Sequence, residues 1–246
     1  MYFIDDENIY KFDNIPLLKT KINDSILNMI KSQENLYLKD ISIISPCFDE
    51  NDKEVSILKD LYKNEFVSKK WEGHYDKIKK SVSECPYCGF GEITEIDHFL
   101  PKYLYPEFIL FYYNLVPSCH NCNKSKLTKI INIHPYIHKI DILNVDLFKL
   151  EIIIEKTNLV FRYNINDNID KNIKQFIEIL KLSERYSMAA NSLFNNDRAY
   201  YKRIDYNGLY NEIRNRYETS TKIHLRYFYK SILDDFQKVY NYIMNN

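Results

Sequence analysis

The sequence predicts an α+β fold in which helices outnumber strands and a small cysteine-bounded core lies between helical layers. Hydrophobic residues make up 45% of the 246-residue chain and aromatic residues 15%, as in ordered globular proteins. Only 4 glycines and 7 prolines are present, too few for the many tight turns of an all-β protein. Four of the five cysteines form two C-x-x-C pairs, a spacing that gathers thiols at one point.

The distribution of charge permits a nucleic-acid partner without demonstrating one. The net charge is zero, yet residues 1–60 carry 7 basic and 12 acidic side chains, a net charge of −5. Residues 61–140 carry 11 and 8, a net charge of +3, and residues 141–246 carry 16 and 14, a net charge of +2. The middle of the chain is therefore mildly basic and compatible with phosphate binding.

The sequence indicates a cytoplasmic protein without a membrane partner. Its first ten residues turn acidic at once and lack the charged start and apolar segment of a secretory signal. The longest apolar runs, such as residues 108–113, are far too short to cross a bilayer.

The N-terminal part, residues 1–83, is expected to form a helical layer. Apolar residues recur at helical spacing in residues 15–32 and again in residues 54–68. A third, shorter helix is predicted for residues 71–82. Cys47, in the polar stretch between the first two helices, is interpreted as a bystander thiol.

The C-terminal part, residues 141–246, is expected to combine a β-hairpin with helices. Residues 148–155 and 159–164 have the composition of strands and flank a short turn at residues 156–158. Helical periodicity returns in two segments, residues 170–183 and much of 186–244. The many tyrosines of these helices are interpreted as core and interface residues in preference to a base-stacking surface.

The middle part, residues 84–140, contains the two C-x-x-C pairs, which are Cys85/Cys88 and Cys119/Cys122. In a cytoplasmic chain such pairs are typical metal ligands. Gly89 relieves the turn that brings the first two thiols together. Four thiolates in a tetrahedron make a closed structural Zn²⁺ site with no position left for a substrate. The zinc is therefore expected to fasten both ends of the intervening segment and to take no part in catalysis.

Three short motifs lie between and after the cysteine pairs. They are Asp97-His98, Asn114-Leu115 and the run Asn123-x-x-Lys126 that continues the second pair. In this order they resemble the HNH endonucleases, also called ββα-metal nucleases, in their four-cysteine form. The resemblance covers residues 84–127, and it implies a small ββα-metal core that hydrolyses phosphodiester bonds in nucleic acid.

The resemblance also implies a role for each signature residue. His98 would be the general base, since a neutral imidazole with a pKa of about 6.5 accepts a proton at neutral pH. Asp97 and Asn123 would hold a catalytic divalent ion, and Asn114, on the second strand of the hairpin, would fix the loop that carries His98. Asn123 replaces a histidine of the family pattern, and oxygen ligands favour Mg²⁺ or Mn²⁺.

Adjacent side chains of a regular strand point to opposite faces, which separates Asp97 from His98. The family combines the two residues through an irregular strand end, with which Pro101 is compatible. Phosphate contacts are predicted for three lysines, which are Lys102, Lys124 and Lys126. His120, inside the second C-x-x-C pair, is a weak candidate for a site residue. His134 is interpreted as structural in preference to catalytic.

A wider set of segments is similar to HNH nucleases of bacterial anti-phage systems, of the Septu and retron-associated types. It includes Cys-Pro-Tyr-Cys-Gly, Ile-Asp-His-Phe-Leu-Pro-Lys and Leu-Lys-Leu-Ser-Glu-Arg-Tyr. This similarity implies an ATPase partner encoded nearby, and the helical layers suit a protein interface.

DNA is the favoured substrate, but two other functions stay open. One is an RNA-cleaving HNH nuclease, such as a tRNA nuclease, because hydrolysis of the phosphodiester does not distinguish RNA from DNA unless the protein contacts the 2′-hydroxyl. The other is a non-catalytic zinc-knuckle module that binds nucleic acid or protein.

Overall fold

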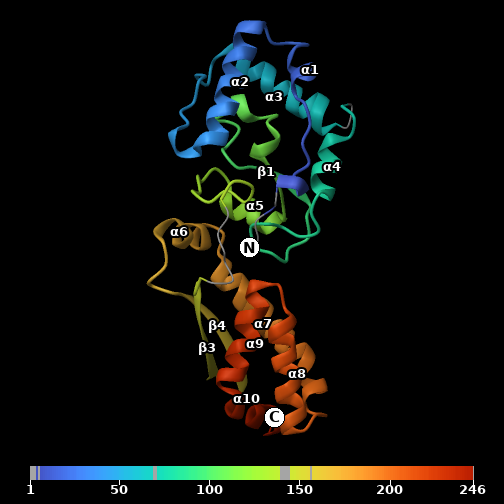
Figure 1. Ribbon diagram of the computed structural model, residues 1–246, viewed down its shortest axis with the longest axis vertical. Helices are drawn as coiled ribbons and strands as arrows, with labels where there is room; N and C mark the ends of the chain where they lie inside the picture. The colour runs from blue at the N-terminus through green and yellow to red at the C-terminus, as the bar shows by residue number, and fades with distance from the viewer. Residues whose placement is uncertain (1–3, 5, 69–70, 139–144, 156, 246) are drawn as a thin grey trace. The chain divides into compact units, whose positions relative to one another are not determined.

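The computed structural model of the chain describes residues 4, 6–68, 71–138, 145–155 and 157–245. The chain divides into two compact units, Met1–Ile140 and Asp141–Asn246 (Figure 1). The boundary expected between residues 140 and 141, and Lys156 of the expected hairpin turn, lie outside the described residues. Helices predominate and each unit contains an antiparallel two-stranded hairpin, so the predicted α+β fold class is confirmed. Within the described ranges, no helix is both long enough and apolar enough to cross a membrane.

The hairpin of the first unit consists of β1 (Glu95–His98) and β2 (Leu115–Ser118). The strands are antiparallel, with Glu95 opposite Ser118 and His98 opposite Leu115. The connection between them contains two 3₁₀ turns, Pro106–Phe108 and Tyr112–Asn114. Asn114 was expected on the second strand, but it ends the second of these turns and immediately precedes β2.

The first unit contains the helices α1 (Ile15–Leu18), α2 (Asp24–Lys39), α3 (Lys53–Asp60), α4 (His74–Lys80) and α5 (His120–Lys126). The helix predicted for residues 15–32 is divided, because α2 begins only at Asp24, where the side chain of Asn23 caps it. α3 continues into a π-helical segment, Leu61–Val67, which buries the ring of Tyr62.

α5 begins earlier than the sequence suggested. Cys119 occupies its N-cap position, so the helix starts inside the second C-x-x-C pair, at His120. Asn123 was expected at the start of this helix and instead lies one turn into it. The carboxamide of Asn123 therefore projects from the side of α5.

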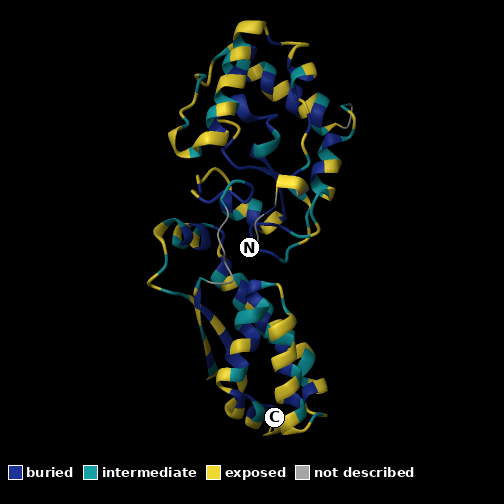
Figure 2. Ribbon diagram, viewed as in Figure 1, coloured by how far each residue is buried: buried dark blue, intermediate teal, exposed yellow. Residues whose placement is uncertain are grey.

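The core of the first unit lies between its helices and one face of the hairpin. α2 and α3 contribute Leu27 and Leu58, and β1 contributes Ile96, all of them buried. Buried and exposed stretches alternate along the helices of this unit (Figure 2). Since Ile96 points into this core, its neighbours Glu95 and Asp97 point to the other face of the strand. The alternation of side chains along β1 thus places Glu95 and Asp97 on the same face of the strand.

The second unit consists of β3 (Phe148–Glu155), β4 (Asn158–Ile165), α6 (Lys171–Ile179), α7 (Leu182–Tyr201), α8 (Tyr206–Thr219), α9 (Ile223–Asp234) and α10 (Phe236–Asn245). α7 packs against β4, and α9 packs against β3 and α8 (Figure 1). The strands alternate: Phe148 and Phe161 are buried beneath the helices, whereas Lys149 and Arg162 are exposed.

The tyrosines of the second unit differ in burial: several lie in the core, whereas Tyr200, Tyr206 and Tyr210 are exposed. Tyr186 and Tyr201 of α7 are each 1% exposed, and the ring of Tyr186 meets that of Phe148 edge-on at 5.5 Å. For these buried tyrosines the contacts agree with the interpretation as packing residues, because a base-stacking surface requires open ring faces.

Candidate functional site

Four cysteines converge in the first unit. The sulfur atoms of Cys85, Cys88, Cys119 and Cys122 lie within 4.8 Å of one another, and all four residues are buried. Sγ of Cys88 and Sγ of Cys119 are 3.8 Å apart. A tetrahedron with Zn–S bonds of about 2.3 Å has sulfur atoms about 3.8 Å apart, so the donor set fits a structural Zn²⁺ ion.

The backbone around the first cysteine pair closes tightly on the thiols. The carbonyl oxygen of Gly91 accepts from the N–H of Cys85 at 2.9 Å, and the N–H of Gly91 donates to Sγ of Cys88 at 3.3 Å. A Cβ atom on Gly91 would lie 2.7 Å from Sγ of Cys119, so only glycine fits there. Gly89, which the sequence did single out, has a φ of +74°, the left-handed region that glycine adopts without strain. Gly91 is a residue that sequence reasoning missed.

The surroundings of the four thiols shift their pKa values. Burial raises the pKa of the Cys85 thiol well above its usual value. Hydrogen bonds with Cys122 and Cys85 lower the pKa of the Cys119 thiol to about 6. A bound Zn²⁺ ion would hold all four ligands as thiolates, so the four residues are suited to a metal.

His98 is fixed by a hydrogen bond to the backbone. Its Nε2 atom lies 3.1 Å from the carbonyl oxygen of Ile109, a group that can only accept. Nε2 therefore carries the proton, and Nδ1 of the neutral ring has a free lone pair. Burial, followed by the charge of nearby Lys102, lowers the pKa of His98 to about 3. The imidazole is consequently neutral at physiological pH.

The Tyr62 ring packs on His98, and Lys102 lies over Tyr62 in turn. Tyr62 of the π-helical segment meets the His98 ring edge-on, with 4.8 Å between ring centroids. Nζ of Lys102 lies 4.8 Å from the centre of the Tyr62 ring, a cation–π distance. An exposed lysine is thus held beside the imidazole, where it can meet an anion.

Asp97 points away from His98 and is engaged by two buried partners. The hydroxyl of Tyr87 donates to it at 2.7 Å, and the ammonium of Lys126 lies 3.0 Å from the carboxylate. Lys126 is 0% exposed and also donates to the carbonyl oxygen of His98 at 2.8 Å. Lys126 was expected to contact phosphate, but a fully buried ammonium is instead the counter-ion of Asp97.

The structure brings Asn123 to Glu95, a residue that sequence reasoning missed. The Asn123 amide donates to one carboxylate oxygen of Glu95, and Nδ1 of His120 lies 2.7 Å from the other. Burial acts to raise the pKa of Glu95, but the hydrogen bonds from His120 and Asn123 lower it. Side chains two positions apart on a strand point to the same face, so Glu95 lies on the same face of β1 as Asp97. The sequence spacing of these two residues could have indicated this.

The Asn114 amide holds the loop that follows His98. It is completely buried, and its Oδ1 accepts from the N–H of Leu100 at 2.7 Å. Its Nδ2 donates to the carbonyl oxygens of Leu100 at 3.1 Å and Phe108 at 3.2 Å. The backbone N–H of Phe99 also donates to the carbonyl oxygen of Asn114 at 2.9 Å. The residues directly after His98 are therefore tied to the start of β2.

The predicted phosphate contacts differ in their access to solvent. Lys102 and Lys124 are exposed, whereas Lys126 is not. Lys124 lies on α5, one residue after Asn123. Two of the three lysines can therefore meet a ligand in solution.

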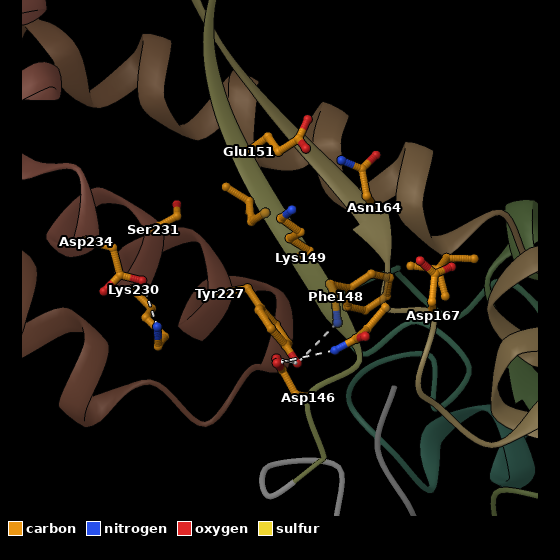
Figure 3. Close-up of a pocket in the computed structure, with 13 residues that line it drawn as sticks. Asp146, Phe148, Lys149, Glu151, Asn164, Asp167, Tyr227, Lys230, Ser231 and Asp234 are labelled. Carbon is orange, nitrogen blue, oxygen red and sulfur yellow. Dashed lines mark hydrogen bonds and ion pairs between the residues drawn. The ribbon is translucent and has the colours of Figure 1, made fainter.

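The second unit has a surface hollow of about 670 Å³ (Figure 3). It lies between β3 and α9, and its polar lining is mostly charged. The hydroxyl of Tyr227 accepts from the N–H of Leu147 at 2.6 Å, and Lys230 pairs with Asp234 at 2.7 Å. The hollow contains none of the residues that the sequence predicted for the site.

Two known proteins are similar to part of this chain. Protein ea31 of Escherichia phage lambda is 41% identical over 93 residues, which is 33% of this chain and 31% of that protein. The Septu protein PtuB of Bacillus thuringiensis is 34% identical over 76 residues, which is 28% of this chain and 30% of that protein.

No protein-family model matches the chain, and no solved structure matches it. The matched segments span less than a third of the length of ea31 and of PtuB. The chain is therefore a partial relative of ea31 and PtuB that carries a buried four-cysteine cluster suited to zinc.

Proposed function

We propose that this protein is a metal-dependent HNH endonuclease that hydrolyses phosphodiester bonds, with DNA as its favoured substrate. The observation that carries the proposal is the hydrogen bond from Nε2 of His98 to the carbonyl oxygen of Ile109. It selects the tautomer in which Nδ1 is the base, and the zinc-fastened hairpin holds the ring in place. The order of signature residues in the chain supports the same reaction.

His98 acts as the general base. Its Nδ1 accepts a proton from the water that attacks phosphorus, while the Ile109 carbonyl oxygen keeps its hydrogen bond to Nε2–H throughout. That oxygen also faces the positive charge that develops on the ring, which lowers the energy of the imidazolium. Lys102, held over Tyr62, is placed to bind a phosphate oxygen near the base.

The catalytic ion is proposed to bind where α5 meets β1, at oxygen donors from both elements. Asn123 and Asp97 are the expected ligands, and Glu95 offers a further carboxylate in contact with Asn123. Such a donor set fits Mg²⁺ or Mn²⁺, and His120 beside Glu95 favours Mn²⁺ of the two. When bound, the ion would neutralise charge on the phosphate and on the leaving oxygen.

The biological setting is proposed to be anti-phage defence. The partial similarity to the Septu protein PtuB supports it, together with the sequence resemblance to defence nucleases. A partner protein, expected to be an ATPase encoded nearby, would control cutting. The second unit is the proposed contact, because it is a compact fold without residues of the nuclease motif.

The nuclease proposal is tested by incubating the purified protein with plasmid DNA and, separately, with total RNA. Each substrate is offered with Mg²⁺, Mn²⁺ or EDTA, and His98→Ala is run in parallel. Metal-dependent cutting of plasmid that His98→Ala lacks supports the proposal, and cutting of RNA alone selects the tRNA-nuclease alternative. Binding of nucleic acid without any cutting, under all conditions, selects the zinc-knuckle module.

A further inference from the structure

A buried chain of hydrogen bonds links three side chains from distant parts of the first unit. They are Tyr37 of α2, Asn114 before β2 and His134, each 0% exposed. The hydroxyl of Tyr37 lies 3.1 Å from Oδ1 of Asn114 and 3.0 Å from Nε2 of His134. Tyr37 therefore bridges the histidine and the asparagine.

The His134 ring decides which group donates in each hydrogen bond of this network. Its Nδ1 accepts from the backbone N–H of Tyr136 at 3.0 Å, so Nδ1 carries no proton. Burial lowers the pKa of His134 well below its ordinary value, which keeps the ring neutral. Its one proton is consequently on Nε2, where the hydroxyl of Tyr37 can accept it alongside the backbone carbonyl oxygen of Tyr113. The hydroxyl's own proton is then left for Oδ1 of Asn114.

The hydrogen bond from Tyr37 completes the bonding of the Asn114 amide. Oδ1 accepts from Tyr37 and from the N–H of Leu100, while Nδ2 donates to the carbonyl oxygens of Leu100 and Phe108. Every donor and acceptor of the amide is used. If the amide were turned by 180°, its NH₂ group would face the donors Tyr37 and Leu100 N–H, and its oxygen would face two carbonyl oxygens. Only the observed orientation is therefore compatible with burial.

We infer that Tyr37 and His134 are positioning residues that lock the Asn114 amide and, through Leu100, the loop that leaves His98. The inference deepens the proposed nuclease function and rests on it. Leu100 is two residues from the base, and a displacement of about 1 Å in a reacting group can cost about 10²-fold in rate. The Ile-His-Pro-Tyr segment, which the nuclease motif does not include, thereby gains a role.

The first test removes only the bridging hydroxyl. Tyr37→Phe retains the ring, which packs edge-on against Phe108 with 5.0 Å between centroids, so the variant is expected to fold and to keep its zinc. Its kcat for plasmid cutting should fall by about 10- to 100-fold, with KM unchanged. The matched control is Tyr201→Phe in α7, which removes a buried hydroxyl bonded to Asp197 at 3.0 Å. That variant should cut at the wild-type rate.

The second test separates positioning from general destabilisation. Because Tyr37 and Asn114 are inferred to act through one amide, Tyr37→Phe should slow Asn114→Ala no further when the two are combined. His134→Gln, which keeps a donor near the Nε2 position, should retain more activity than His134→Leu. Additive losses in the double variant, or a Tyr37→Phe protein that cuts at the wild-type rate, would overturn the inference.

A third measurement does not depend on cutting. Nitrogen-15 NMR of the wild-type protein should show His134 with a proton on Nε2 and none on Nδ1, and the Nε2 signal should move in Tyr37→Phe. A proton on Nδ1 would overturn the inference whatever the activity. A wild-type protein that cuts neither DNA nor RNA would instead refute the nuclease proposal, and the positioning role with it. The NMR result would still show whether the chain of hydrogen bonds exists.

Discussion

At the scale of single residues, the two ring nitrogens of His98 differ in their partners. Nε2 is tied to the Ile109 carbonyl oxygen, and Nδ1 of the neutral ring has a lone pair. Burial lowers the pKa of His98 to about 3, so the ring is neutral at physiological pH. As the proposed general base, it would therefore be in its proton-accepting form there.

His98→Ala is expected to lose cleavage by at least ~10²-fold, the usual size of a general-base contribution. Folding and zinc content should be unchanged, because His98 is not a ligand of the four-cysteine site. Initial rates on plasmid DNA, with metal analysis of the same samples, provide the measurement. Cutting by His98→Ala at the wild-type rate would refute the proposed mechanism and leave the zinc-module interpretation.

The face of β1 opposite His98 presents two carboxylates, and a metal titration can separate their roles. If Asp97 and Asn123 bind the catalytic ion, both Asp97→Ala and Asn123→Ala should lose activity, and high Mn²⁺ should partly restore that of Asn123→Ala. Asp97→Ala should also lose stability, because it leaves the buried ammonium of Lys126 unpaired. Glu95→Gln should respond to Mn²⁺ as Asn123→Ala does if Glu95 is also a ligand. Asn114→Ala should show no such rescue, since its loss misplaces His98. A Glu95→Gln variant with the wild-type dependence on metal would restrict the site to Asp97 and Asn123.

At the scale of elements, the four-cysteine cluster joins the hairpin to α5. β1 and β2 have only four residues each, too short to be stable alone. The cysteine pairs fasten the segment before β1 to the start of α5, so a bound ion would stabilise all three elements at once.

Cys85→Ser and Cys119→Ser should therefore unfold or aggregate the protein, and not merely slow it. The wild-type protein should contain about one zinc ion per chain, as expected for a single four-thiolate site. Elemental analysis and circular dichroism check both statements. Cys47→Ser is the matched control, because Cys47 lies outside the cluster and should leave zinc and fold unchanged. A well-folded wild-type sample without zinc would contradict the assignment.

α2 also carries a carboxyl group that makes stability depend on pH. Glu34 accepts from the side-chain amide of Asn14 at 2.8 Å, yet burial raises its pKa from 4.5 to about 7. The folded state thus binds a proton that the unfolded state releases. The stabilising effect of this proton on the folded state is complete below about pH 4.5 and is lost as the pH rises through 7.

Glu34→Gln should remove this dependence, because a glutamine keeps the acceptor for Asn14 and cannot ionise. The wild-type unfolding free energy should fall relative to the variant by about 1–2 kcal/mol between pH 5 and pH 8, a value reduced for partial exposure of the group. Urea unfolding of both proteins at the two pH values provides the comparison. Parallel stability profiles would show that the Glu34 pKa is ordinary.

At the scale of the whole molecule, the motif that resembles HNH nucleases occupies one of two compact units. The first contains all the signature residues, and the second is a hairpin covered by helices with its own aromatic core. Among the described residues, only the four cysteines form a cluster of metal-binding His, Cys, Asp or Glu side chains. A role in protein contact is therefore the proposal for the second unit.

The isolated protein is expected to be a weak or untargeted nuclease whose activity a neighbouring gene product changes. Co-expression with the proteins encoded beside it, followed by pull-down on this chain, should recover a stable complex. The cleavage rate of the complex should differ from that of the chain alone. A strictly monomeric enzyme with full, unregulated activity would count against this role.

The sequence by itself determined the fold class, the cysteine cluster and the order of the signature residues. These follow from local rules, since period, composition and C-x-x-C spacing act over a few residues. Only the tertiary structure decided the pairing of side chains: Lys126 with Asp97, and Asn123 with Glu95. Those contacts depend on how far α5 is rotated against β1 and on where that helix begins, and neither is encoded in local spacing.

The same limit explains the residues that the sequence could not identify. Gly91 is required because Sγ of Cys119, 28 positions further along the chain, occupies the space of a side chain. Tyr37 is needed because its hydroxyl bridges Asn114 and His134, which lies 97 positions further along the chain. A buried hydrogen bond between distant residues forms only when packing brings both partners out of water together. The residues that form such a bond can therefore be identified from the folded core and not from the sequence.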